Sequence, residues 1–189
     1  VPQIVANFPE FRKSGRATAG HLGIAVPRDR LGLNLAPRAF EFDAETESER
    51  FTETHEIVSF GDLMKDGVLS LTTCDEIGKL AYGTGNIPFV RTSDISNWEV
   101  KLDPKQCVSE EVYERFKSRQ DVKKDDILMV RDGTYLIGTC AIITEYDLPM
   151  LYQSHIFKIR VESTDRLTPF LLLAALNSSF VQRQIKSFC

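Results

Sequence analysis

Hydrophobic residues follow β-strand patterns in the part of the chain after residue 56. Short apolar runs rich in β-branched residues at 87–92 and 154–161 predict strands. The segment 126–143 holds two further runs on either side of Asp132-Gly133, a pair that favours a tight turn, so this segment predicts a β-hairpin. We expect these strands to form a twisted, mostly antiparallel sheet.

Two helices are predicted where a capping residue precedes apolar positions at helical spacing. Ser109 can cap the first helix, and Thr168 with Pro169 after it can begin the second, which we expect to run as one helix to residue 189. The predicted fold class is therefore α+β, with one helix packed on the sheet and a C-terminal helix projecting away from it. The apolar stripes are expected at Val112, Tyr113 and Phe116 in the first helix and at Leu173, Leu176, Phe180, Val181, Ile185 and Phe188 in the second.

Acidic residues are concentrated in one stretch near the start of the chain. The protein carries a net charge of −4, and residues 41–56 alone sum to −6, which leaves the rest at +2. We therefore divide the chain into a connecting or docking segment at 1–56 that contains this acidic strap (41–56), a compact domain at 57–167 and the helix at 168–189. The mildly basic remainder can present a basic face to a partner.

The composition is that of an ordinary soluble globular protein. Of the 189 residues, 42% are hydrophobic and 26% charged, and the longest apolar run, 170–176, is too short to cross a bilayer. The four cysteines lie far apart, which favours reduced thiols and a cytoplasmic location. Because the chain begins with Val1 rather than Met, we expect it to be part of a longer polypeptide or to be trimmed at its start.

The catalytic motifs of DNA-modifying enzymes are missing from the sequence. It has neither the Gly-rich cofactor loop and Asn/Asp-Pro-Pro-aromatic motif of an amino-methyltransferase nor a phosphate-binding G-x-x-x-x-G-K-[ST] loop. Gly83-Thr84-Gly85 is interpreted as part of a hairpin or loop and not as a ligand-binding loop. Ser154 and His155 are adjacent in an expected strand, so they would point to opposite faces and form no nucleophile–base pair. We expect no catalytic residue, no metal site and no cofactor.

Four segments with recognisable motifs follow one another from residue 57. The first, 57–63, places Gly61-Asp62-Leu63 after a short apolar stretch expected to be a strand, and the second, 87–95, matches I-P-[FW]-[IV]-[RK]-[TG]-x-D-[IL]. The third, 125–138, is close to G-D-[IL]-[IL]-[IV]-x-R-[DN]-G-[ST]-x-G, and the fourth, 169–185, to P-x-[FY]-L-x-x-x-L-N-S-x-x-[VF]-Q-x-Q-I. In this order the motifs resemble the target recognition domain of the specificity subunits of type I restriction–modification systems, in which the last helix leads towards a spacer helix.

The resemblance has departures and an upstream extension. Asp125 stands where the third motif begins with Gly, and added residues precede Gly138. Residues 24–38 look like the segment that joins an adenine methyltransferase domain to a fused recognition domain. The chain is thus similar either to part of a specificity subunit or to the C-terminal recognition part of a fused adenine methyltransferase of the type IIG kind.

The resemblance implies a role without catalysis. Domains of this family read one half of a DNA target and direct an adenine methyltransferase, and in type I systems a restriction subunit, to it. It therefore implies a sequence-specific DNA-recognition module whose partners are double-stranded DNA, the methyltransferase as a subunit or fused domain, and the restriction subunit. A homodimer formed through the helices is an open alternative that would read a palindromic site.

Side chains suited to DNA gather in the loops at the ends of the predicted strands. Basic and hydroxyl groups position phosphates, whereas Arg, Asn and Gln read base edges. Arg91 and Arg131 each have an aspartate nearby in the sequence, so a role in holding the fold is the alternative for both. The candidate DNA-binding residues are Lys79, Tyr82, Thr84, Asn86, Arg91, Thr92, Ser93, Arg131, Thr134, Tyr135, Gln153, Ser154 and His155.

Two other classes of function stay open. The pairs Glu99/Lys101 and Asp121/Lys123 fit the short [DE]-x-K pattern of magnesium-dependent nucleases. Alternatively, the chain is a protein-interaction module that docks a methyltransferase through the acidic strap and the last helix. A nuclease would cleave DNA by itself with magnesium, whereas an interaction module would leave the choice of DNA sites unchanged.

Overall fold

The computed structural model describes residues 56–101, 103–133 and 135–187. The chain divides into two units, one of residues Glu56–Gln182 and the other of Val1–His55 with Arg183–Cys189. The expectations for residues 1–55, including nearly all of the acidic strap, lie outside the described residues, as does the candidate residue Thr134. The described helices and strands belong to the unit Glu56–Gln182, except that the last helix, α6 (Ser179–Ser187), ends in the other unit.

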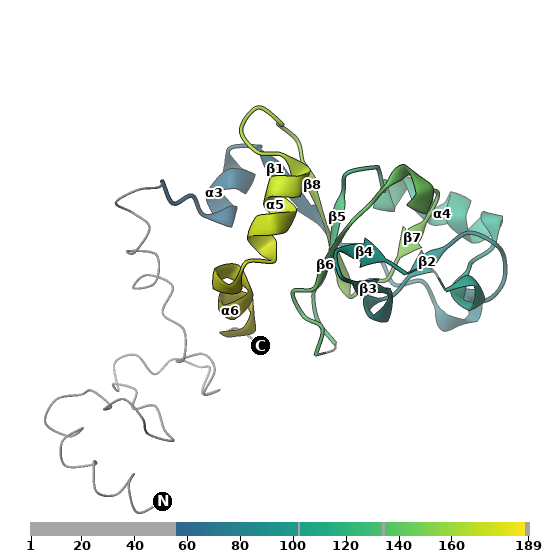
Figure 1. Ribbon diagram of the computed structural model, residues 1–189. Helices are drawn as coiled ribbons and strands as arrows, with labels where there is room; N and C mark the ends of the chain where they lie inside the picture. The colour runs from purple at the N-terminus through teal and green to yellow at the C-terminus, as the bar shows by residue number, and fades with distance from the viewer. Residues whose placement is uncertain (1–55, 102, 134, 188–189) are drawn as a thin grey trace, which may run out of the picture. The chain divides into compact units, whose positions relative to one another are not determined.

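A four-stranded antiparallel sheet forms the centre of this unit (Figure 1), so the predicted α+β class is confirmed. The two strands expected within 126–143 pair with each other, with Leu128 opposite Ala141, but the second begins only at Cys140, so a longer connection replaces the tight turn expected at Asp132-Gly133. The strand expected at 154–161 begins only at Ile156, because residues 154 and 155 form a turn. The sheet order is β1 (Leu69–Thr72), β8 (Ile156–Val161), β5 (Ile127–Val130) and β6 (Cys140–Ile142).

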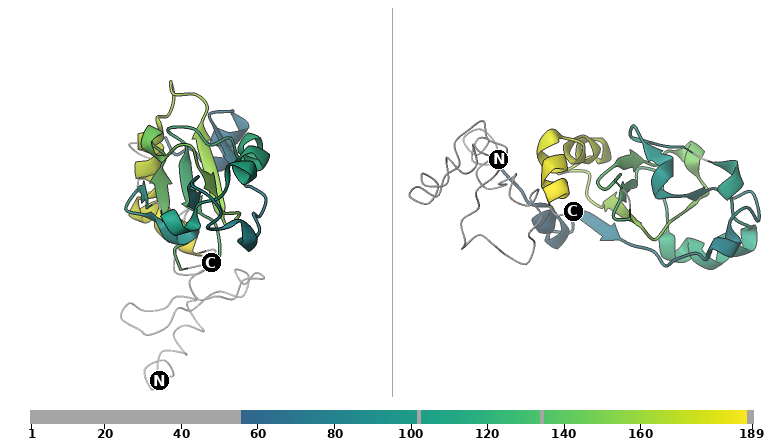
Figure 2. Two further views of the ribbon diagram at one scale, coloured as in Figure 1. Left: turned by 90° about the vertical axis from the view of Figure 1, so that its right-hand side faces the viewer. Right: turned by 90° about the horizontal axis from the view of Figure 1, so that it is seen from below.

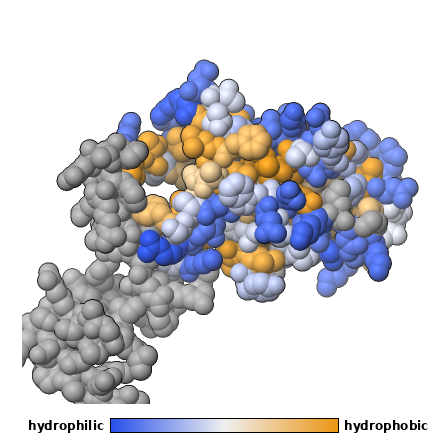
Figure 3. All heavy atoms as spheres, viewed as in Figure 1, coloured by the Kyte–Doolittle hydropathy of each residue, from blue (hydrophilic) through white to orange (hydrophobic). Residues whose placement is uncertain are grey.

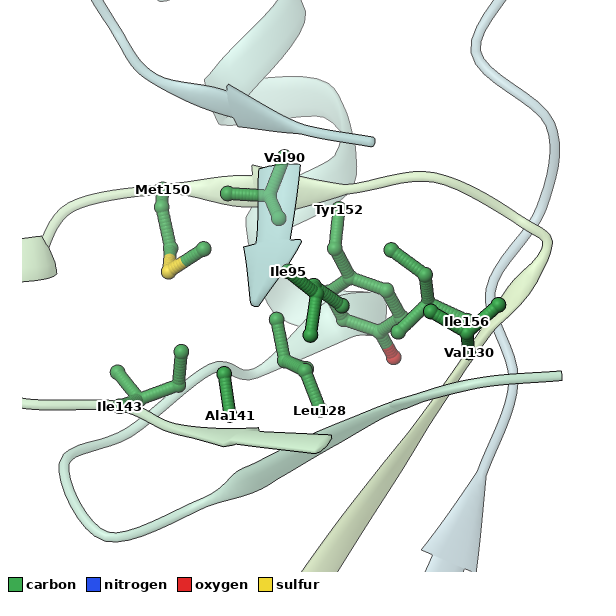
Figure 4. Close-up of a cluster of buried hydrophobic side chains, with 9 residues drawn as sticks. All are labelled: Val90, Ile95, Leu128, Val130, Ala141, Ile143, Met150, Tyr152 and Ile156. Carbon is green, nitrogen blue, oxygen red and sulfur yellow. The ribbon is translucent and has the colours of Figure 1, made fainter. Parts of the chain in front are cut away.

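Side chains alternate between the two faces of this sheet, as strand geometry requires. Ile127 and Cys140 belong to a buried cluster with residues of α3 and α5, whereas Leu128 and Ala141 belong to another cluster with residues of β2, β3 and β7. Figure 4 shows the second cluster, in which Tyr152 lies over the sheet. The elements that cover the faces are α3 (Phe60–Lys65) and α5 (Pro169–Leu176) on one side and β2 (Phe89–Val90), β3 (Ile95–Ser96), β4 (Glu99–Val100) and β7 (Leu151–Tyr152) on the other.

The helix α4 (Glu110–Gln120) forms an outer layer beyond β2 and β7, far from α5 (Figure 2). Ser109 caps it as predicted, because the Ser109 hydroxyl accepts a hydrogen bond from the Val112 amide at 3.3 Å. The predicted stripe packs against Phe89 and Leu151. The side chain of Gln120, the last residue of the helix, pairs with the backbone of β7. It accepts from the Tyr152 amide at 2.8 Å and donates to the Tyr152 carbonyl at 3.0 Å.

The single C-terminal helix predicted from residue 168 is wrong, because it is broken into α5 and α6. The start is as expected, since the Thr168 hydroxyl accepts from the Leu171 amide. The break occurs where Asn177 donates its side-chain amide to the Leu173 carbonyl at 2.8 Å, and the Ser178 hydroxyl then accepts from the Val181 amide. Both residue types compete with the helix for backbone groups and favour its ends.

The strand expected near residue 57 is also wrong. Residues 57–59 form no strand, and Gly61-Asp62-Leu63 lies inside α3, whose N-cap is Ser59. The apolar alternation was too short there to decide between strand and helix, while the Ser59 cap, which accepts from the Asp62 amide at 3.0 Å, favours the helix.

The expected strand 87–92 shrinks to the two residues of β2, and it pairs in parallel with β7. Val90 lies opposite Tyr152, so both strands end at the same edge. The residues after them, Arg91 and Gln153, therefore start their loops side by side, and the Gln153 amide donates to the Val90 carbonyl at 2.9 Å.

Candidate DNA-contacting site

Three loops meet at this edge, and we call their described residues, Arg91–Asp94, Arg131–Gly133, Tyr135 and Gln153–His155, the sheet-end cluster. The Thr92 amide donates to the side-chain carbonyl of Gln153 at 3.3 Å. The Arg131 amide donates to the His155 carbonyl at 2.9 Å, because β5 ends where antiparallel β8 begins. Eight of the thirteen candidate residues thus lie in one cluster, although they come from three segments, the first and last of which are about sixty positions apart.

Arg91 is held in place by acidic partners. Its guanidinium donates to both carboxylate oxygens of Asp94 at 2.9 and 3.0 Å, and to Asp103 at 3.3 Å. The hydrogen bonds to Asp94 raise the pKa of Arg91. The structure therefore contains the fold-holding arrangement that the sequence left as an alternative, and a paired, partly buried guanidinium has few donors left for DNA.

Arg131 has a similar arrangement on the neighbouring loop. Its Nε donates to Asp132, and its guanidinium carbon lies 5.7 Å from the centre of the Phe157 ring. Asp132 contacts the Nδ1 atom of His155 with its other carboxylate oxygen. Burial acts to raise the pKa of Asp132, but the hydrogen bonds with Arg131 and His155 outweigh it, so the pKa of Asp132 is lowered.

These pairs leave the cluster without excess positive charge. Together with Asp103, its described ionised side chains are two arginines and three aspartates, a net charge of −1 when His155 is neutral and zero when it is protonated. The cluster as a whole therefore has no net positive charge to attract phosphate in either state of His155.

The remaining cluster residues differ in how far they face solvent. Tyr135 is 94% exposed, Ser93 is exposed and donates to Asp94, and Gln153, Ser154 and His155 are partly exposed. Thr92 is buried, so its side chain does not face solvent. The prediction that Ser154 and His155 lie in a strand on opposite faces is wrong, since both belong to a turn, but neither is paired with the other.

The other candidates, Lys79, Tyr82, Thr84 and Asn86, precede β2 and form a second group, the loop group. Thr84 ties this loop to the start of α4, because its hydroxyl accepts from the Ser109 amide at 3.1 Å. Tyr82 stacks on Phe89 with ring centres 4.8 Å apart. Burial raises the pKa of the Tyr82 hydroxyl, and Arg91 acts to lower it, which places the loop group within electrostatic reach of the sheet-end cluster. Lys79 and Asn86 are exposed.

Three exposed residues nearby were not among the candidate DNA-binding residues, although one of them, Lys101, was named as part of a nuclease pattern. Trp98 sits at the tip of the β3–β4 hairpin with φ of 70°, is 50% exposed, and its carbonyl accepts from the Ile142 amide at 3.0 Å. A left-handed backbone is uncommon for so large a residue and is a reason to look for function. Lys101 and Lys105 are exposed on the loop that runs on to Ser109. As DNA contacts, their only signal was a position just after the 87–95 motif.

The acidic residues of the pairs that fit a nuclease lie at the end of α4 and on β4. Asp121 ends α4 and forms ion pairs with Arg160 at 2.7 Å and Lys123 at 3.1 Å, while Glu99 is exposed on β4. The residues that the structure describes include no group of three or more His, Cys, Asp or Glu side chains able to hold a metal ion.

Three cysteines, Cys74, Cys107 and Cys140, are free thiols, and Cys189 lies outside the described residues. No helix in the described part of the chain has the length and apolar character to cross a membrane.

Comparisons with known proteins found similarity only at the level of solved structures. No family model matches the chain, and no curated protein matches it. The crystal structure of a type I restriction–modification S subunit from M. genitalium is similar, with 13% identity and a TM-score of 0.45, over 80% of this chain and 34% of that one. A structure described for the assembly and conformational transition of the type I restriction–modification system has 16% identity and a TM-score of 0.43, over 90% and 49%. The chain thus spans between a third and a half of these proteins, and values this low do not say what it does.

Proposed function

We propose that the chain is a non-catalytic, sequence-specific DNA-recognition module of a restriction–modification system, which reads one half of a target and directs an adenine methyltransferase to it. The observation that carries the proposal is the order of the four motifs, together with the meeting of two of them in the fold. The motif at 87–95 and the motif at 125–138 are far apart in sequence, yet both contribute to the sheet-end cluster.

Within this proposal the candidate residues divide by how free their donors are. Gln153 uses its carbonyl oxygen to hold Thr92, which leaves its amino group as a donor for a base edge. Lys79, Ser93, Asn86 and Tyr135 are exposed and suited to phosphates or base edges. The two paired arginines position the loops instead of reading bases.

The decisive experiment is an adenine methylation map of the source cells with and without residues 57–189 of this reading frame. The proposal expects one methylated motif to disappear, and that motif is the target. A matched pair of point variants sharpens the result: Gln153→Ala changes the methylated motif, whereas Glu114→Ala, on the exposed side of α4, does not. If every motif survives the deletion in cells that express the system, the recognition role is wrong.

A second role, docking of the methyltransferase, is favoured by the exposed side of α5. Phe170 and Leu171 are 66% and 58% exposed, and hydrophobic surface is visible over this helix (Figure 3). A helix that is apolar on all sides is usually covered. The double substitution Phe170→Ser with Leu171→Ser should abolish co-purification with the methyltransferase while the urea midpoint stays close to that of the parent. Undiminished co-purification would remove α5 from the interface.

A further inference from the structure

One carboxylate, that of Asp132, lies between the side chains of Arg131 and His155 at the end of β5. It accepts from Arg131 with one oxygen and contacts Nδ1 of His155 with the other. The three side chains form a chain of charges at the surface of the sheet-end cluster, because between a third and a half of each remains exposed.

The backbone fixes this arrangement. The Arg131 amide is hydrogen-bonded to the His155 carbonyl, so the two residues cannot separate without breaking the end of the β5–β8 ladder. Gly133 follows Asp132 with φ of 81°, and a Cβ atom there would lie 3.6 Å from Nδ1 of His155, so the turn passes directly beside the ring. With Nδ1 engaged, the second ring nitrogen, Nε2, makes no hydrogen bond to any residue of the described chain.

The charge of this group changes with the protonation of one residue. Arg131 and Asp132 are charged throughout the neutral range, so the three side chains sum to zero when His155 is neutral and to +1 when it is protonated. The thiol of Cys74 also interacts electrostatically with Arg131, but burial raises the pKa of Cys74 to about 12, so this thiol stays uncharged.

We propose that His155, held by Asp132, is a phosphate-binding site for the DNA backbone that is active only when the imidazole is protonated. This inference rests on the proposed DNA-recognition function and adds the ligand and the regulation of one residue. The protonated ring donates from Nε2 to a phosphodiester oxygen, Asp132 is the positioning residue on Nδ1, and Arg131 offsets the Asp132 charge that would otherwise repel the phosphate.

Phosphate contacts are independent of sequence, so the test needs no knowledge of the target. The affinity of the full chain for a duplex of random sequence is measured by fluorescence anisotropy between 50 and 200 mM salt, at pH 5.5 and at pH 8.5. Loss of one phosphate contact makes the negative slope of log K against log salt less steep by about 0.9. It also lowers the affinity at 0.1 M salt by about eightfold. We expect these changes on going from pH 5.5 to pH 8.5.

The chain contains only three histidines, His21, His55 and His155, which supplies matched controls. His155→Gln should bind at pH 5.5 as the parent does at pH 8.5, with no further change in slope, whereas His21→Gln and His55→Gln should keep the full pH dependence. Asp132→Asn should bind more tightly than the parent at pH 8.5, because it leaves Arg131 unopposed; a merely structural carboxylate would give weaker binding at both pH values. Urea midpoints establish that each variant is folded.

The outcomes separate this inference from the function on which it rests. Salt-dependent binding with the same slope at both pH values, or a pH dependence that survives in His155→Gln, overturns the His155 site and leaves DNA recognition standing. Absence of any salt-dependent binding at pH 5.5 overturns both.

Discussion

Gly85, which lies between Thr84 and Asn86 of the loop group, is the position where the structure makes the sharpest prediction. A Cβ atom added there would lie 2.5 Å from the Cα of Ser109 and 2.5 Å from the carbonyl oxygen of Val108. Both are backbone atoms at the start of α4, so no side-chain rotation can relieve the contact. Gly85→Ala must therefore displace either the loop or the helix start.

The size of the effect follows from the distances. An ordinary contact begins at 3.4 Å, so the two segments must separate by about 0.9 Å. The bonds from the Thr84 amide to Cys107 at 3.2 Å and from the Ile87 amide to Val108 at 3.1 Å would then be too long. Two lost hydrogen bonds at about 1 kcal/mol each and about 1–3 kcal/mol of overpacking give a loss of roughly 3–5 kcal/mol.

Urea unfolding of the full chain measures this loss, with the fluorescence of its single tryptophan, Trp98, as the probe. Gly78→Ala is the matched control, because Gly78 has φ of −56° and nothing within 4 Å of its Cβ position. We expect the control to unfold within about 0.5 kcal/mol of the parent. A Gly85→Ala variant that matches the control would refute the reasoning that the loop and α4 are in close contact.

Three further predictions concern stability and are read from urea midpoints. Asp125 has φ of 70° where the resembling motif has glycine, so Asp125→Gly should stabilise the fold by about 1 kcal/mol, and an equal gain from Asp125→Ala would point to charge instead. Lys158 is 5% exposed and donates to two carbonyls at the end of α4, so Lys158→Met should cost about 2 kcal/mol by leaving them unpaired, and a neutral result would contradict that capping role. Hydrogen bonds from Arg160 lower the pKa of Asp121 from 3.8 to about 2. The ionised Asp121 therefore stabilises the fold above pH 3.8, and this stabilisation is lost as the pH falls towards 2. With allowance for an exposure of 46%, the parent should lose about 1 kcal/mol more than Asp121→Asn over that range, and parallel curves would exclude the ion pair.

Local signals predicted the elements whose boundaries are set by local chemistry. Ser109 and Thr168 cap their helices as expected, and the strands expected on either side of Asp132-Gly133 pair with each other, although the second begins only at Cys140. In each case the decisive interaction joins residues close in the sequence, so the pattern contains the information needed.

Pairings between distant segments could not be predicted in the same way. The parallel contact of β2 with β7 joins residues about sixty positions apart through strands of two residues, too short for any periodicity. The backbone amide and carbonyl of Tyr152 are paired by the side chain of Gln120, a contact that sequence patterns do not reveal. The break in the C-terminal helix could not be predicted because two local signals conflicted. The helical spacing of apolar residues continued past Asn177, whereas the Asn177 side chain bonds to the backbone and favours the end of a helix.

The candidate site shows the same limit at the level of single side chains. Residue type alone ranks arginine first for reading guanine, yet Arg91 and Arg131 are both engaged by aspartates. An arginine held by an aspartate must weaken a charge-assisted hydrogen bond if its guanidinium is to turn towards a base, which offsets much of the gain. At the sheet-end cluster we therefore expect Gln153 to read a base edge and His155 to contact a phosphate, with the two arginines as supports. On this argument, substituting either arginine should weaken binding to every sequence alike, whereas substituting Gln153 should change which sequence is preferred.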